Sequence, residues 1–253
     1  MGNKIIIIGY GVIGKLEYKI LEKLKPYIYD KYNQSNNTAN LEEEYDFAII
    51  CVPTPLKDNS CDTSEVWNAV NEVKAKIYII KSTVAVGTCD KIAVATSKHI
   101  VHSPEHSGAT QHCNNFEYNF TILGGDKKDC YKVQQMYQEV FDARHTFKVV
   151  DRQTSELSKY MLNSYLAMKV SFCSQFWKVC QELDIPYEEL RECFTLDPRI
   201  NSAHTFIYDE HPYWQSHCFD KDIPSIMNQF DMELLKDIIS QEDQCHTVLI
   251  ITE

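Results

Sequence analysis

Cys218 and Asp222 combine a nucleophile and a carboxylate at a spacing of four residues. If a helix begins here, its first turn carries both side chains on one face. The N-terminus of that helix would favour the thiolate, which is the reactive form of cysteine. A Cys-x-x-x-Asp spacing is more often structural, so the pair alone indicates a nucleophilic site without establishing one.

Lys159 and Asn163 form a second pair with the same spacing, near the start of the longest helical pattern in the chain. A Lys–Asn pair on a helix is usually solvated surface. Here the residues at 160–162 are Tyr, Met and Leu, so the pair need not face water. We therefore keep both residues as site candidates.

The segment at 9–14 reads Gly-Tyr-Gly-Val-Ile-Gly and directly follows an apolar run. This pattern between a strand and a helix is typical of dinucleotide binding, because glycine lets the backbone approach a pyrophosphate at the helix N-terminus. Asp30 closes the next expected strand, where a carboxylate would accept hydrogen bonds from ribose hydroxyls and repel a 2′-phosphate. The pattern predicts NAD rather than NADP, a preference that Lys31 slightly weakens. The candidates from this motif are Gly9, Gly11, Val12, Ile13, Gly14 and Asp30.

The elements that must position these residues divide the chain into two halves. Apolar runs alternate with helical patterns up to about residue 150, which predicts an α/β fold with a Rossmann-type doubly wound parallel sheet. All eight glycines lie in the first 125 residues, so the second half is expected to be mostly helical. We expect an NAD-binding Rossmann domain at 1–150 and a helical dimerisation and substrate domain at 151–253. The expected strands are 4–8, 27–29, 47–51, 77–80, 100–102, 120–123 and 147–150.

One long helix is expected over residues 154–183, because large apolar residues recur there at spacings of three and four. We interpret this stripe as core and as the seam of a homodimer. Its members are Leu157, Met161, Tyr165, Met168, Phe172, Phe176 and Val179. The remaining expected elements are a short helix at 187–194, an irregular loop at 195–217, a helix near 225–240 and a strand at 247–251.

Composition excludes several classes of partner. Lys plus Arg number 25 against 36 Asp plus Glu, and the net charge of −11 argues against nucleic acid. No apolar run approaches the roughly 18 residues that span a membrane, and the N-terminus lacks a signal-peptide pattern, so we expect a cytoplasmic protein. The ten cysteines include no Cys-x-x-Cys pair, and no metal is expected. A metal cluster drawn from His102, Glu105, His106, His112 and Cys113 would match no common zinc spacing.

Further motifs occur in a fixed order together with these pairs. They are Cys-Val-Pro-Thr-Pro at 51–55, Asp-Thr-Ser-Glu-Val at 62–66, Lys-Ser-Thr-Val at 81–84, Ser-Pro-Glu at 103–105, Gly-Gly at 124–125 and Asp-Pro-Arg-Ile at 197–200. With the glycine segment and the segment from Cys218 to Asp222, they resemble the UDP-glucose/GDP-mannose dehydrogenase family over about residues 4–226.

The resemblance implies two successive NAD-dependent oxidations of a primary alcohol on a nucleotide sugar, giving a carboxylate through a cysteine thiohemiacetal and thioester. It implies that Cys218 is the nucleophile, that Lys159 and Asp222 manage a proton and a water, and that Glu105 is the base for hydrolysis. The other implied roles are substrate binding by Asn163 and Arg199, a catalytic and cofactor-binding position for Thr83, and cofactor binding by Val52, Pro53 and Thr54. It also implies pairing of two chains through the long helix.

Three features depart from the family pattern. The loop before Cys218 reads Pro-Tyr-Trp-Gln-Ser-His at 212–217, where the family has glycines. The stretch directly after Glu105 reads His-Ser-Gly-Ala at 106–109 and lacks the second glutamate of the family pattern. The chain is expected to be a short form without the family's C-terminal nucleotide-binding domain. Two alternatives therefore stay open: a member that binds NAD or a partner without turnover, and a one-step sugar or hydroxyacid dehydrogenase.

Overall fold

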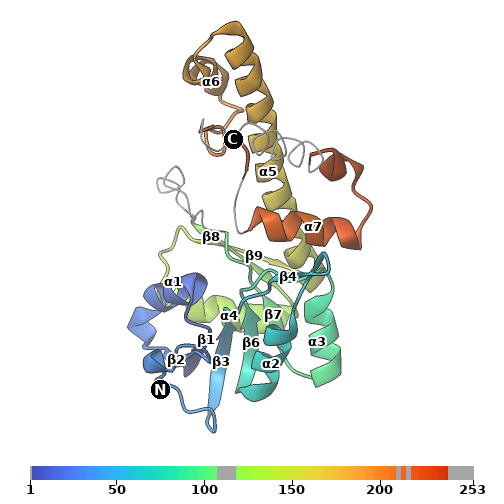
Figure 1. The fold of residues 1–253 in the computed structure, drawn as a ribbon. Coiled ribbons are helices and arrows are strands. Elements are labelled where there is room, and N and C mark those ends of the chain that lie inside the picture. Colours follow the sequence, from blue (N-terminus) through green and yellow to red (C-terminus); the bar gives the residue numbers. More distant parts are fainter. Residues whose placement is uncertain (1, 107–117, 209–211, 215–217, 239–253) are drawn as a thin grey trace. The chain divides into compact units, whose positions relative to one another are not determined.

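The computed structural model describes residues 2–106, 118–208, 212–214 and 218–238 (Figure 1). These residues divide into two compact units, one containing 2–106 and 118–159 and the other beginning at Tyr160. The boundary between the units falls inside one long helix. The division at residue 150 expected from the sequence stays a prediction.

The first unit is built on one seven-stranded sheet in the order β2-β1-β3-β6-β7-β8-β9. All neighbouring strands run parallel except β7 and β8, which pair antiparallel through His102 and Gly124. The expected Rossmann-type fold is confirmed, with this one antiparallel pairing as a departure from a fully parallel sheet. The strands are β1 (Ile5–Ile8), β2 (Tyr27–Tyr29), β3 (Glu44–Ile50), β6 (Lys74–Ile80), β7 (Ile100–His102), β8 (Phe120–Gly124) and β9 (Thr146–Val150).

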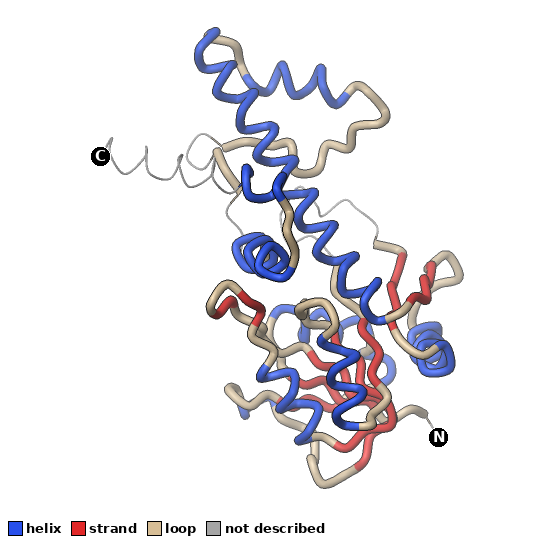
Figure 2. The backbone as a smooth tube through the Cα atoms, turned by 90° about the vertical axis from the view of Figure 1, so that its right-hand side faces the viewer, coloured by secondary structure: helices blue, strands red, loops and turns tan. Residues whose placement is uncertain are grey.

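Successive strand residues send their side chains to opposite faces, and helices cover both faces (Figure 2). Ile6 and Ile8 pack in one apolar cluster with residues of α2 and α3, while Ile5 and Ile7 pack in the other with residues of α4. This double burial explains why the strand sequences are apolar without alternation. The helices of this unit are α1 (Val12–Ile20), α2 (Ser64–Glu72), α3 (Thr88–Thr96) and α4 (Lys127–Gln138), together with the short η1 (Glu22–Leu24) and η2 (Gln34–Asn36).

The central strands are longer than expected at their N-terminal ends, since β3 starts at Glu44 and β6 at Lys74. Their first three residues include charged side chains and, apart from the buried Tyr45, are exposed or half-buried, so no apolar run marks them. A small hairpin of β4 (Leu56–Lys57) and β5 (Ser60–Cys61) follows β3.

The long helix α5 (Arg152–Leu183) is present, and it starts two residues before the expected position. Asp151 explains the earlier start, because its carboxylate accepts hydrogen bonds from the backbone N–H and the hydroxyl of Thr154 at 2.8 and 2.6 Å. The apolar stripe of α5 is largely exposed, from 45% at Phe176 and Val179 to 76% at Met161. The expectation that this stripe forms core is therefore wrong for the single chain.

The second unit contains α6 (Tyr187–Thr195), α7 (Phe219–Gln229) and a helical segment at 233–238. The helix expected near 225–240 differs at both ends, because α7 spans Phe219–Gln229 with Pro224 inside it and a separate helical segment covers 233–238. Phe219, Ile223 and Ile226 are buried at helical spacing, and this burial outweighs the hydrogen bond that proline removes. The strand expected at 247–251 lies outside the described residues. None of the described helices combines the length and apolar content that crossing a membrane requires.

Candidate active site

The glycine loop after β1 has the backbone geometry that the motif predicts. Gly9 has φ +87°, and a Cβ there would lie 2.7 Å from the carbonyl oxygen of Cys51. A Cβ at Gly14 would lie 1.9 Å from the carbonyl oxygen of Gly9, so this glycine allows α1 to pack on the loop. A Cβ at Gly11 would meet no heavy atom within 4 Å, which leaves open space next to the helix start.

Val12 and Ile13 open α1 directly after this loop. The backbone N–H groups of a first helical turn have no partner inside the helix and attract anions. No side chain caps the start of α1, since the N-cap residue is Gly11. The open space and the uncapped amides together fit the pyrophosphate of a dinucleotide.

Asp30 is held in place at the end of β2. Its Oδ2 atom accepts a hydrogen bond from the backbone N–H of Tyr10 at 2.7 Å, and its Oδ1 atom accepts bonds from Tyr32 and Asn33 at 2.9 and 2.8 Å. Burial opposes the charge, but the three N–H donors outweigh it and lower the pKa of Asp30. The Nζ atom of Lys31 lies 3.5 Å from a carboxylate oxygen of Glu65, and this carboxylate raises the pKa of Lys31. Because Glu65 partly neutralises the positive charge of Lys31, that charge weakens the expected preference for NAD less.

The segments after β3 and β6 lie against each other at the same edge of the sheet. Thr54 Oγ1 donates to the carbonyl oxygen of Thr83 at 2.7 Å, and Ser82 Oγ donates to that of Val52 at 2.7 Å. These bonds fix the backbone of Val52, Pro53 and Thr54 beside Thr83. Because β1 has β2 on one side and β3 on the other, the strand order reverses here, and open α/β sheets bind their ligands at this edge.

Glu105 follows β7 and is part of a buried charge cluster that was not predicted from the sequence. Lys81 Nζ lies 2.8 Å from Glu17 Oε1 and 3.4 Å from Glu105 Oε2. Glu17 occupies a position of α1 where the spacing from Ile13 and Ile20 would place an apolar residue. An acidic residue at such a position is the signal that could have revealed the cluster.

Two histidines border this region and are uncharged at neutral pH. Burial lowers the pKa of His102 to about 3 and that of His106 to about 4. His102 Nδ1 lies 2.9 Å from Ser155 Oγ. Across the described part of the chain, no three His, Cys, Asp or Glu side chains converge as metal ligands, and His112 and Cys113 lie outside that part.

Lys159 lies on the first turns of α5, and these turns are fixed to the sheet unit through Glu156. Glu156, one turn before Lys159, is buried and accepts hydrogen bonds from the backbone N–H groups of Gly87 and Cys89 at 2.6 and 2.8 Å. It thereby caps the start of α3 from another helix, a contact that sequence spacing does not reveal. Lys159 belongs to the first unit and lies one turn before Asn163 on α5.

Asn163, Cys218 and Asp222 are brought together within the second unit. Asn163 Nδ2 donates to Asp222 Oδ2 at 2.6 Å, and both residues are buried. Cys218 is the exposed N-cap residue of α7, and its carbonyl oxygen accepts the backbone N–H of Asp222 at 2.9 Å. Lys221, whose side chain is 13% exposed, forms an ion pair with Asp222. The cysteine and the aspartate thus share the first turn of a helix, as their spacing predicts.

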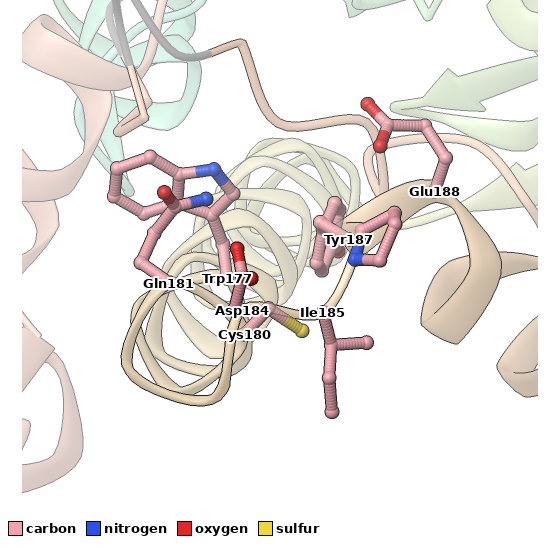
Figure 3. Close-up of a pocket in the computed structure, with 8 residues that line it drawn as sticks. Trp177, Cys180, Gln181, Asp184, Ile185, Tyr187 and Glu188 are labelled. Atoms are coloured by element: carbon pink, nitrogen blue, oxygen red, sulfur yellow. The ribbon is translucent and has the colours of Figure 1, made fainter.

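Arg199 is not held against any of these residues in the described structure. Its side chain is 86% exposed and forms a bidentate contact with Asp197, with the shortest distance 2.6 Å. A hollow of about 290 Å³ lies where α5 ends and α6 begins, between Trp177 and Glu188 (Figure 3). None of the predicted catalytic or binding residues is among the described residues that line this hollow.

The model of the UDP-glucose/GDP-mannose dehydrogenase family, NAD binding domain, matches residues 3–143, and that of the central domain of the same family matches residues 153–243. A UDP-glucose 6-dehydrogenase of Rickettsia prowazekii is 29% identical over 90% of this chain and 58% of its own length. A UDP-N-acetyl-D-mannosamine dehydrogenase of Methanocaldococcus jannaschii is 28% identical over 75% and 48%. The chain thus spans about half the length of the curated relatives it matches.

Among solved structures, a UDP-glucose dehydrogenase from Pyrobaculum islandicum superposes with a TM-score of 0.79. The match covers 95% of this chain and 68% of that protein, at 20% sequence identity. At this identity the likeness supports the fold alone.

Proposed function

Since the chain belongs to the UDP-glucose/GDP-mannose dehydrogenase family, we propose that it oxidises the primary alcohol of a nucleotide sugar to a carboxylate in two steps. Residues 3–143 form the family's NAD-binding domain. The residues present fit that cofactor, because the space at Gly11 admits a pyrophosphate and Asp30 is fixed as an acceptor for ribose hydroxyls. Bound NAD would accept a hydride in each oxidation.

The observation that carries this proposal is the contact of Asn163 with Asp222 on the helix turn that begins at Cys218. The first oxidation turns the alcohol into an aldehyde. The Cys218 sulfur then adds to the aldehyde carbon, and the carbonyl oxygen takes a proton to give a thiohemiacetal. Loss of a second hydride and of the hydroxyl proton leaves a thioester, and water cleaves its carbon–sulfur bond to release the carboxylate and the thiol.

The other residues take roles that suit their chemistry. The Lys159 ammonium stabilises the negative charge that develops on the substrate oxygen, and Glu105 removes the proton of the hydrolytic water. Asp222 orients a water and is itself fixed by Asn163. The Asn163 amide also has an oxygen and a second N–H group for a sugar hydroxyl. Thr83 positions water or substrate, and Arg199 meets the charged part of the substrate.

Cys218→Ser tests the proposal directly. A serine hydroxyl forms a hemiacetal but is a poorer nucleophile and leaving group, so the second oxidation should slow more than the first. NADH and aldehyde release would be measured across a panel of nucleotide sugars and simple sugar phosphates. Cys193→Ser is the matched control, because Cys193 is also exposed but lies on α6. Equal rates for the wild type and Cys218→Ser would contradict the thioester route.

Glu105→Gln should separate hydrolysis from oxidation. The variant should accumulate acyl-enzyme, seen by mass spectrometry as added mass on the Cys218 peptide, because the water has lost its base. One NADH per substrate with no such adduct, and no effect of Cys218→Ser, would instead favour a one-step dehydrogenase.

A second candidate function is NAD binding without turnover. The loop before Cys218 favours it, because Trp214 occupies a segment where the family has glycines. Its indole N–H donates to Ser171 Oγ at 3.0 Å, and its ring packs edge-on against Phe219, the residue after Cys218. Stabilisation by NAD together with no NADH from any sugar, and a Cys218 alkylated no faster than the other cysteines, would decide for this function.

A homodimer is also part of the proposal. The exposed stripe of α5 presents Met161 and Tyr165, 76% and 55% exposed, to solvent in the single chain. Large contiguous apolar surfaces of this kind usually bind a partner, and a second copy would cover the same stripe with the same residues.

A further inference from the structure

Glu17, Lys81 and Glu105 place one buried cation between two carboxylates. Glu17 and Lys81 are 1% and 6% exposed, and their charged atoms are 2.8 Å apart. Glu105 contacts the same ammonium group at 3.4 Å and accepts the backbone N–H of His106 with its other oxygen at 3.0 Å. The three residues come from α1, the end of β6 and the segment after β7, so the folded sheet alone brings them together.

The other titratable groups that contact or lie near the cluster are uncharged at pH 7 or act from outside it, so Lys81 is the cation at its centre. Tyr137 on α4 donates its hydroxyl to Glu17 at 2.9 Å. Burial raises the pKa of both Tyr137 and Cys51, so the phenol and the thiol keep their protons. His102 and His106 are neutral at pH 7, and Lys159 acts on His106 by its charge.

Lys81 keeps its proton in this environment. Burial opposes the charge, but Glu17 and then Glu105 outweigh it and raise the pKa of Lys81. A buried ammonium with two carboxylates divides its attraction between them. The ion pair with Glu17 is the shorter of the two, so Glu17 takes the larger part.

We propose that Glu17 is a positioning residue for Glu105, acting through Lys81: it holds the ammonium group away from Glu105 and so keeps Glu105 basic enough to accept a proton from water. The inference rests on the proposed function, because the role of Glu105 as a base belongs to it. Without the Glu17 charge, Lys81 would pair with Glu105 alone, and Glu105 would release its proton more readily and accept one less readily.

The test is Glu17→Gln in the full chain, with the Glu105 carboxyl followed by ¹³C NMR and assigned through Glu105→Gln. The titration midpoint of Glu105 should move to lower pH by about one unit, because a nearby negative charge is lost and the cation is no longer shared. Glu17→Gln with Lys81→Met removes the pair as a neutral unit and should move the midpoint back up. An unchanged midpoint in Glu17→Gln would overturn the proposal.

Asp129→Asn is the matched control for loss of a buried carboxylate. Asp129 is buried in the same unit and pairs with His99, without a contact to Lys81 or Glu105 in the described structure. This variant should leave the Glu105 midpoint where it is. A shift equal to that of Glu17→Gln would show a general effect on folding and overturn the specific role of Glu17.

Activity separates this inference from the proposed function. In an active chain, the acid limb of the kcat profile should shift to lower pH in Glu17→Gln, and kcat should fall at neutral pH more than KM changes. If no variant turns over substrate but the NMR midpoint shifts, the charge coupling stands and the proposed function fails. If turnover is present and neither the limb nor the midpoint shifts, the inference fails and the proposed function stands.

Discussion

Gly11 separates the demands of folding from those of cofactor binding. A Cβ at this position would meet no heavy atom within 4 Å, and the φ of −76° lies outside the left-handed region that favours glycine. Gly11→Val should therefore melt like the wild type without cofactor but lose stabilisation by NAD, because the side chain fills the pyrophosphate space. At 100 times the Kd, NAD should stabilise the wild type by about 2.7 kcal/mol. Thermal melts with and without NAD measure this.

Gly2→Val serves as the control for Gly11→Val, since a Cβ at Gly2 also meets nothing within 4 Å. It should retain the full response to NAD. NADP should stabilise the wild type much less, because the fixed Asp30 carboxylate repels a 2′-phosphate. Equal stabilisation by the two cofactors would contradict this assignment.

His102 makes the first unit sensitive to acid. Its pKa is lowered to about 3 in the folded chain against about 6.5 when unfolded, so the unfolded state binds more protons between these values. Stability from the neutral histidine is complete above pH 6.5 and is lost as pH falls toward 3, by about 1.4 kcal/mol per unit at the steepest. Urea unfolding at pH 7 and pH 5 should show this loss, and His102→Asn should reduce it. An equal loss in the variant would assign it to other groups.

Features that depend on local backbone geometry could be predicted from the sequence, while the roles of the glycines and Asp30 in binding NAD stay a proposal. The glycines and Asp30 follow directly from a strand, a turn and a helix start, which lie within about twenty residues. The pair of Glu17 with Lys81 could not be predicted in this way, because the two residues are 64 positions apart and only sheet topology joins them. The roles of Cys218 and Glu105 stay predictions that the experiments above test.

At the scale of elements, Glu156 couples the start of α5 to the start of α3. Its carboxylate accepts two backbone N–H groups that α3 leaves unpaired. Glu156→Gln keeps the shape of the side chain but replaces one carboxylate oxygen with an NH₂ donor. One of the backbone N–H groups of Gly87 and Cys89 then loses its acceptor. The free energy of unfolding should fall by about 1–3 kcal/mol in a urea titration. Glu182→Gln, at an exposed position near the end of the same helix, should change it by less than about 0.5 kcal/mol.

Element boundaries were predictable where an apolar pattern reached the boundary. β2 and β7 have the expected limits, because every residue in them is apolar, aromatic or histidine. The starts of β3 and β6 were missed because their charged first residues pair as strands without joining the apolar run. The range expected for the last helix, near 225–240, starts too late, although the spacing of Cys218 and Asp222 favoured a helix start at 218. Burial of Phe219 and Ile223 accompanies the extension of α7 through Pro224.

At the scale of the whole molecule, the apolar stripe of α5 is exposed in the single chain. The apolar stripe of a helix normally packs against a protein core or a partner. Here Leu157, Phe172 and Phe176 remain between 45% and 49% exposed. Burying one such side chain contributes about 1.5–3 kcal/mol, so several of them suffice to hold two copies together. The same stripe on a second copy provides the matching surface.

We therefore expect the chain to sediment as a homodimer at micromolar concentration and to dissociate when the stripe is charged. Met161→Asp and Tyr165→Asp place two carboxylates on adjacent turns of α5, and a symmetric contact would bring them near their copies in an apolar setting. The double variant should sediment as a monomer, with its far-UV circular dichroism unchanged because both positions are exposed in the single chain. Leu196→Asp is the control, since Leu196 is 81% exposed and lies just beyond α6, outside the stripe. A monomeric wild type, or a double variant that stays dimeric, would contradict pairing through α5.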